Sequence, residues 1–247
     1  MTTTVITPAT ATVPWKLPTE LQDKQGVNIA VMGYPGSGKT EFGASGPKPL
    51  VVDIDGTAVR TLGGRTDVQI APIKNWDDID RLSTYLLSRP HPFQTIWWDS
   101  LTFAQTYALK KIMVGSAPGV MPSQGQYGNA NELVLDLVRT WCAQARERGV
   151  HVGFAVHAEE VKDESTGQVL IRMALTPGCI KGVNMATDTI GYLAVAPNSD
   201  NRKMLLRSTG RVLAKHHQPK DSPNKLPPEL DSPTFRMFID QTKAVTK

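Results

Sequence analysis

Short apolar segments alternate with helical patterns along most of the chain. Apolar runs that predict buried strands lie at 27–32, 49–55, 68–73, 95–100 and 150–161. Helical spacing of apolar residues occupies 75–89, where Asn75 is the expected N-cap, 101–115 and 129–149. This alternation predicts an α/β fold with a mostly parallel sheet flanked by helices. After about residue 165, the segments QVLIRMAL, TIGYLAVAP and KMLLRST predict antiparallel strands added at one sheet edge, on the C-terminal side.

Composition divides the chain into three parts. A Thr-, Pro- and Ala-rich start predicts a disordered tail at 1–25, followed by a core at 26–220 and a basic extension at 221–247. No apolar run approaches the roughly 20 residues that span a bilayer, and the start lacks the features of a signal peptide. Cys142 and Cys179 stand far apart without metal-ligand spacing, which argues against a disulfide framework or a zinc site. We therefore expect a cytoplasmic protein with no membrane partner.

Charge is distributed unevenly. The net charge is +4, yet residues 201–247 carry ten Lys or Arg against four Asp or Glu, and residues 1–200 carry 17 against 19. A basic C-terminal part is compatible with contact to phosphates, although a solvated surface explains the same excess.

The segment GYPGSGKT at 33–40 fits the pattern G-x-x-x-x-G-K-[ST], between a predicted strand and a helix-compatible stretch. Its glycines let backbone N–H groups surround a β-phosphate, Lys39 bridges the β- and γ-phosphates, and the Thr40 hydroxyl ligates Mg²⁺. A Gly-rich turn in an unrelated fold is the alternative. The motif predicts ATP and Mg²⁺ as ligands, with this nucleotide-binding set: Gly33, Tyr34, Pro35, Gly36, Ser37, Gly38, Lys39, Thr40 and Glu41.

Asp99 ends the strand in TIWWDS and is placed to hold Mg²⁺ opposite Thr40, as the acid of a Walker B motif does. The same aspartate can instead cap the helix that follows. Ser100 comes next, where AAA+ type ATPases ordinarily carry a water-activating glutamate. The sequence therefore disfavours that class.

A general base is then expected from another strand. Asp53 and Asp55 end PLVVDID before Gly56, on a strand that we expect beside the strand at 27–32, which precedes the phosphate-binding loop (P-loop) at 33–40. With 33–40 and 95–100, this pattern resembles the RecA/RadA superfamily of recombination ATPases, in particular the phage-encoded RecA-core proteins of single-strand annealing. The resemblance covers roughly 27–220. It implies that Asp55 orients the attacking water, at a position where the family usually has Glu. Because the Asp side chain is shorter, we expect slow hydrolysis. The alternative is that these acids only cap the turn that follows.

Two further positions carry the resemblance. His157 ends a strand where the family places a polar residue that senses the γ-phosphate, although a lone His there is often a hydrogen-bonded core residue. In GRVLAKHHQP (210–219), Lys215 matches the lysine that RadA-type proteins insert into a neighbour's active site. His216 and His217 depart from the family's pattern, and no ligand cluster supports a metal there.

The resemblance implies a ring or filament of identical subunits acting on single-stranded DNA, with a single-stranded-DNA-binding protein as a further candidate partner. DNA contacts are expected from two predicted loops, 116–128 with Tyr127 for stacking and 176–187 with Lys181 for phosphate, unless both are simply solvent-exposed. The expected activity is a DNA-stimulated, Mg²⁺-dependent ATPase of phage-type recombination in a bacterial cytoplasm. A P-loop kinase for a small molecule and an ATP-gated, non-hydrolysing DNA-binding scaffold remain as alternatives.

Overall fold

The computed structural model describes residues 25–117, 119–162, 164, 167–196, 199–218 and 225–245. Apart from Gln25, the predicted tail at 1–25 lies outside the described residues. The strands are β1 (Asn28–Gly33), β2 (Pro49–Asp53), β3 (Gln69–Pro72), β4 (Thr95–Asp99), β5 (His151–Lys162), β6 (Val169–Met173), β7 (Thr189–Val195), β8 (Arg202–Leu205), β9 (Lys215–His216) and β10 (Glu229–Asp231). The helices are α2 (Lys39–Ala44), α3 (Ala58–Thr61), α4 (Trp76–Ser88), α5 (Leu101–Ile112), α6 (Gln124–Arg148), α7 (Pro177–Ala186) and α8 (Phe235–Val245). Among these helices, none combines the length and the apolar character that a bilayer crossing requires.

The strands within the described residues form one sheet, whose main path follows the order β10-β8-β7-β1-β5-β4-β2-β3. From β7 to β3 all neighbours are parallel. β8 and β10 add antiparallel pairs at the β7 edge. The predicted α/β class, with a mostly parallel sheet and antiparallel strands on the C-terminal side, is confirmed.

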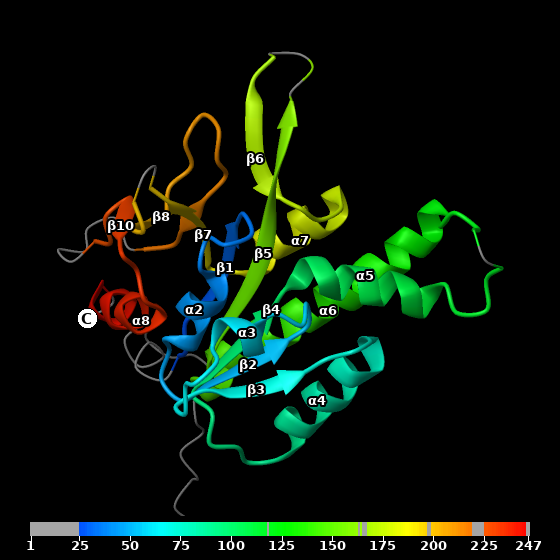
Figure 1. Cartoon of the computed structure of the whole chain (residues 1–247), viewed down its shortest axis with the longest axis horizontal. Coiled ribbons are helices and arrows are strands. Elements are labelled where there is room, and N and C mark those ends of the chain that lie inside the picture. The colour runs from blue at the N-terminus through cyan, green and yellow to red at the C-terminus, as the bar shows by residue number, and fades with distance from the viewer. Residues whose placement is uncertain are drawn as a thin grey trace, which may run out of the picture.

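Two details of the predicted sheet are wrong. β2 does not lie beside the P-loop strand β1, because β5 and β4 stand between them. β7 is parallel to β1, with Ile29 opposite Thr189 and Met32 opposite Tyr192, although its sequence suggested an antiparallel strand. β6 is antiparallel as expected, but it pairs with the end of β5 and forms a hairpin that projects beyond the sheet (Figure 1). The composition of a strand indicates how deeply it is buried. Which strand lies beside it, and in which direction that strand runs, depends on the whole fold.

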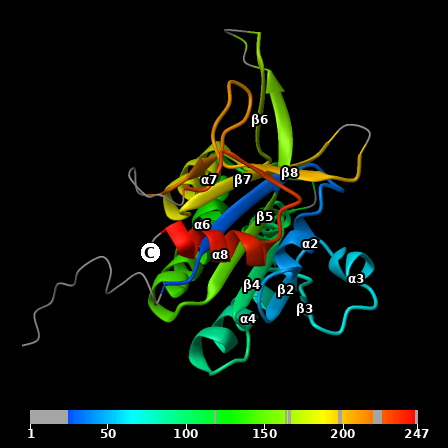
Figure 2. The ribbon, with the colours of Figure 1, turned by 90° about the vertical axis from the view of Figure 1, so that its left-hand side faces the viewer.

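Alternating side chains divide the core into two layers. From β1, Ala30 and Met32 join the cluster that includes α4, α5 and α6, whereas Ile29 and Val31 join the cluster with α2 and α8. Figures 1 and 2 show these two helical layers on opposite faces of the sheet. Because successive strand residues point to opposite faces, every central strand contributes to both layers.

Trp97 of β4 is fully buried under α2. Its ring meets Phe42 and Phe235 edge-on, each at a centroid distance of 5.7 Å. An added Cβ at Gly43 or at Gly153 would lie 2.0 Å from atoms of the indole. Both glycines are therefore required by the space that the indole occupies.

We expect Gly153→Ala to lower the free energy of unfolding by roughly 1–3 kcal/mol, because the new methyl group overlaps a ring that is confined on both sides. Denaturant unfolding measures the change. Gly128→Ala, on the exposed part of α6 with no atom within 4 Å of the added Cβ, is the matched control. That control is expected to leave stability unchanged or raise it by about 0.5–1 kcal/mol. Equal stability of the two variants would contradict this packing.

The predicted loop at 176–187 is almost entirely helical, and the last five residues of the predicted loop at 116–128 belong to a helix, which corrects the first assignment and shortens the second. Helix α6 begins at Gln124, since the Ser123 side chain accepts from Gln126 N at 3.3 Å and Gln126 Oε1 accepts from Ser123 N at 2.8 Å. Tyr127 therefore lies in the first turns of a helix. The predicted loop at 176–187 is α7, whose Gly182 packs against Leu135 of α6. The capping box and this close helix contact outweigh the local glycine and proline content.

The segment 225–245 is packed into the fold. β10 pairs with β8, and α8 lies across the sheet face that also carries α2 (Figure 2). Phe235 and Phe238 are fully buried, and Phe235 N donates to Ser45 Oγ at 2.7 Å. Burial of these two rings holds the C-terminal helix against the layer behind the P-loop.

Candidate nucleotide-binding site

The P-loop connects the end of β1 to the start of α2. Gly36 and Gly38 adopt left-handed φ angles of 80° and 92°, which glycine reaches without the strain of a Cβ. The loop borders a pocket of about 410 Å³ at the carboxyl ends of the parallel strands. Of the predicted nucleotide set, six residues line the pocket and three do not: the lining residues are Pro35, Gly36, Gly38, Lys39, Thr40 and Glu41, and the others are Gly33, Tyr34 and Ser37.

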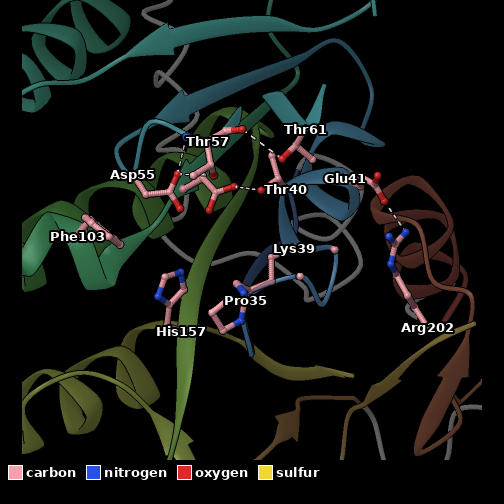
Figure 3. Close-up of a pocket in the computed structure, with 13 residues that line it drawn as sticks. Pro35, Lys39, Thr40, Glu41, Asp55, Thr57, Thr61, Phe103, His157 and Arg202 are labelled. Atoms are coloured by element: carbon pink, nitrogen blue, oxygen red, sulfur yellow. Dashed lines mark hydrogen bonds and ion pairs between the residues drawn. The ribbon is translucent and has the colours of Figure 1, made fainter. Parts of the chain in front are cut away.

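Lys39 lies at the centre of this pocket (Figure 3). Its residue surface is only 6% exposed, and Nζ donates to the carbonyls of Gly33 at 2.8 Å and Tyr34 at 3.0 Å. Burial lowers the pKa of the ammonium, while Asp99 and Asp55 act to raise it. The two carbonyls and the two acids together keep a buried cation directed at the space where phosphates are expected.

Thr40 and Asp99 form the predicted metal pair. Thr40 Oγ1 donates to Asp99 Oδ2 at 2.6 Å, across from α2 to the end of β4. Burial raises the pKa of Asp99 to about 6, and the hydrogen bond from Thr40 opposes that rise. A buried carboxylate beside a hydroxyl is an oxygen donor set of the kind that Mg²⁺ prefers.

Asp55 reaches the same pocket from the turn after β2, although β5 and β4 separate β2 from the P-loop strand β1. Its backbone N donates to Asp99 O at 3.2 Å, which ties the ends of β2 and β4 together. Asp55 Oδ1 accepts from Thr57 N at 3.0 Å and from Thr57 Oγ1 at 2.7 Å. Asp53 turns away to accept from the amides of Thr57 and Ala58 at the start of α3. Asp55 thus both closes a turn and faces the pocket, whereas Asp53 serves the turn alone.

His157 of β5 lies directly opposite Gly33 in the sheet and lines the pocket. Its ring meets Phe103 edge-on at 5.8 Å. Burial lowers the pKa of the imidazole, and the nearby Lys39 lowers it further. Both effects favour the neutral imidazole, which can offer either a donor or an acceptor to a phosphate or to water.

Other predicted site residues lie elsewhere. Lys215 is on β9, which pairs with the start of β7 and so with the end of the sheet opposite the P-loop; its Nζ donates to Asn184 O of the same chain. Tyr127 is 38% exposed on α6. Lys181 borders a separate apolar groove between β6, α7 and the segment that precedes β9. The structure brings none of the three to the nucleotide pocket of its own chain.

The pocket also contains residues that the sequence did not single out, namely Thr57, Thr61, Phe103 and Arg202. Arg202 forms an ion pair with Glu41 at the far side of the P-loop (Figure 3). No motif surrounds it, and only the basic excess after residue 200 drew attention to that region.

The residues present fit a magnesium nucleotide. The pocket offers a lysine and an arginine to an anionic ligand, and the Thr40 and Asp99 oxygens to a cation. At Gly36 no atom lies within 4 Å of the position that a Cβ would take, so there is open space beside the loop backbone. Its volume is within the usual range for ligand pockets, about 300–1,000 Å³. In the described residues no cluster of three or more His, Cys, Asp or Glu suggests another metal centre.

Two comparisons with known proteins bear on this site. A family model described as an AAA domain matches residues 25–218. That range contains the P-loop and every acid, histidine and lysine discussed above. No curated protein matches the chain.

Proposed function

The chain belongs to the AAA domain family, and from this premise we propose that it is a RecA-like, Mg²⁺-dependent ATPase that acts on single-stranded DNA in phage-type recombination or strand annealing. The coarser part, a P-loop NTPase fold with a nucleotide pocket, follows from the family and the fold. Family membership also corrects the interpretation of Ser100, because its presence after Asp99 does not exclude an AAA domain. The observation that carries hydrolysis is the meeting of Lys39, Asp99 and Asp55 in one pocket.

The roles follow from position and charge. A bound Mg²⁺ would neutralise charge on the phosphates, held on this chain by Thr40 and Asp99. Lys39 offers its ammonium to the β- and γ-phosphates. Asp55 faces the same end of the pocket as Asp99 and is our candidate for orienting the attacking water and taking its proton. His157 is then the neutral group beside the γ-phosphate, where it distinguishes ATP from ADP.

Two features of the sequence support the proposed DNA role. The RecA-like sequence pattern and the basic C-terminal part of the chain favour it. Tyr127 and Lys181 are our candidate contacts, from neighbouring helices α6 and α7. An exposed tyrosine and an exposed lysine suit base stacking and phosphate contact, respectively. A homo-oligomeric ring or filament belongs to the same proposal.

The decisive experiment measures phosphate release by the full chain, with Mg²⁺ and without any acceptor, in the presence and absence of an oligothymidylate. We expect slow basal turnover that rises with DNA and weakens as salt increases. A small-molecule kinase would give no turnover without an acceptor and no response to DNA. A non-hydrolysing scaffold would bind DNA in an ATP-dependent way without releasing phosphate. Either pattern would replace the proposed function.

Lys215 tests the proposed oligomer. If its ammonium reaches the nucleotide of a neighbouring subunit, Lys215→Ala should retain ATP binding while hydrolysis falls by ~10³-fold or more, as for trans-acting cations in phosphoryl transfer. Mixing it with Lys39→Ala should restore part of the activity, since some interfaces then pair an intact P-loop with an intact lysine. Absence of rescue, with DNA binding weakened and DNA-free hydrolysis unchanged, would make Lys215 a DNA-contacting surface charge instead.

A further inference from the structure

Arg202 begins β8 and pairs with Val195, the last residue of β7. This places its side chain beside the P-loop, where it lines the nucleotide pocket. Its Nη1 forms an ion pair with Glu41 of α2, and the two side chains are 38% and 44% exposed. The backbone is fixed by a hydrogen bond from Ser232 N to Arg202 O at 2.7 Å.

The guanidinium rests on the P-loop backbone itself. An added Cβ at Gly38 would lie 2.4 Å from Arg202 Nε and 2.7 Å from Cζ. Glycine at this position therefore serves two purposes: it permits the left-handed φ of 92°, and it leaves the space that the arginine fills. Such close contact keeps a planar cation at the wall of the phosphate loop.

One donor of this guanidinium is unused. Arg202 Nε is buried and has no hydrogen-bond partner among the described residues. A buried N–H without an acceptor is costly, and the rest of the arginine side chain, which is 38% exposed, lines the pocket where an anionic ligand is expected. The Glu41 carboxylate occupies one side of the fork and leaves the other nitrogens for a second acceptor.

The two ends of the pocket are lined by different residues. Asp55, Phe103 and His157 lie at one end, Glu41 and Arg202 at the other, and Lys39 and Thr40 between them (Figure 3). The γ-phosphate belongs at the Asp55 end, because the candidate base Asp55 and the metal-binding candidate Asp99 are neighbours there. The opposite end is then left for the α-phosphate and the nucleoside.

We propose that Arg202 binds the α-phosphate of the nucleotide, with Glu41 holding the guanidinium in place. This inference rests on the proposed nucleotide site and assigns a new contact within it. It makes Arg202 a ground-state contact shared by ATP and ADP, unlike Asp55 and His157 at the γ-phosphate end. It also explains why an acid is tolerated at an anion-binding loop, since the arginine offsets the charge of Glu41.

Titration calorimetry of the full chain with ATP and with ADP tests the assignment. Arg202→Gln should weaken both nucleotides by the same factor, roughly 10- to 100-fold, as expected for loss of a charge-assisted hydrogen bond. Arg202→Lys, which keeps the charge but not the fork, should give a smaller loss and guards against misfolding of the glutamine variant. Loss of ATP affinity with ADP unaffected would place Arg202 at the γ-phosphate, and unchanged affinity for both would remove the contact.

Two controls separate direct contact from general charge effects. Arg207→Gln removes the same charge from an exposed position outside the pocket and should leave both affinities unchanged. In a Glu41→Gln background, Arg202→Gln should still weaken binding. Full affinity of that double variant would mean that the arginine acts only by neutralising Glu41. Failure of the wild-type chain to bind either nucleotide would refute the proposed function, whereas normal wild-type binding with an indifferent Arg202→Gln would refute only this inference.

Discussion

Replacing Lys39 by alanine is expected to abolish productive ATP binding and to lower turnover by ~10²–10³-fold or more. The ammonium is the cation at the centre of the pocket, held by the carbonyls of Gly33 and Tyr34 at 2.8 and 3.0 Å. An alanine leaves those carbonyls without a donor and leaves the transferred phosphate without its positive charge. Nucleotide calorimetry and phosphate release measure the two effects separately.

The control for this variant is Lys74→Ala, which removes an exposed lysine ahead of α4. We expect that control to retain wild-type affinity and turnover. Thermal unfolding of both variants without nucleotide checks that the loop change is local. Wild-type binding and turnover by Lys39→Ala would overturn the assignment of the P-loop.

Asp99→Asn is expected to reduce Mg²⁺-dependent hydrolysis by ~10²–10³-fold while nucleotide binding without Mg²⁺ is retained. The asparagine oxygen can still accept the hydrogen bond from Thr40, so the wall of the pocket keeps its shape, but the negative charge for the metal is gone. Phosphate release across a Mg²⁺ titration measures the loss of hydrolysis, and nucleotide affinity in EDTA measures binding without the metal. An equal loss of both would indicate a folding defect in place of a metal role.

The raised pKa of Asp99 adds a pH signature to the same variant. Burial raises that pKa from 3.8 to about 6, so ionisation of this carboxyl costs more free energy in the folded protein than in the unfolded chain. This group therefore stabilises the fold fully below about pH 4 and loses that contribution as pH rises through about 6. Without Mg²⁺, Asp99→Asn should be more stable than the wild type at pH 8, by up to about 3 kcal/mol. No gain at pH 8, measured by denaturant unfolding, would contradict an ionised, desolvated Asp99.

Part of this site could be predicted from the sequence, because it depends on residues that are close together in the chain. GYPGSGKT defines its own loop, because glycine φ angles and a lysine at fixed spacing are properties of eight consecutive residues. Asp99 is the last residue of a fully buried strand, and Asn75 accepts from Asp78 N as a helix cap should. Each of these features is decided within a few residues, so sequence was sufficient.

Helix starts within glycine-containing segments were harder to predict. The Ser123 and Gln126 capping box was present in the sequence, yet Gly125 and Gly128 made the segment look like a loop. In α7, the contact of Gly182 with Leu135 shows that glycine permits a close approach of two helices. Intrinsic propensity is worth only about 1 kcal/mol for glycine, which caps and packing readily exceed.

The sequence by itself determined the P-loop, the acid at the end of β4, the α/β alternation and the two-sided burial of the central strands, since each depends on residues that are near neighbours in the chain. Only the tertiary structure decided that β5 and β4 separate β1 from β2, that β7 runs parallel to β1, and that Arg202 meets Glu41 across 161 positions. Strand order and long-range ion pairs depend on which surfaces are buried together. That choice minimises the free energy of the whole chain, and no local segment specifies it.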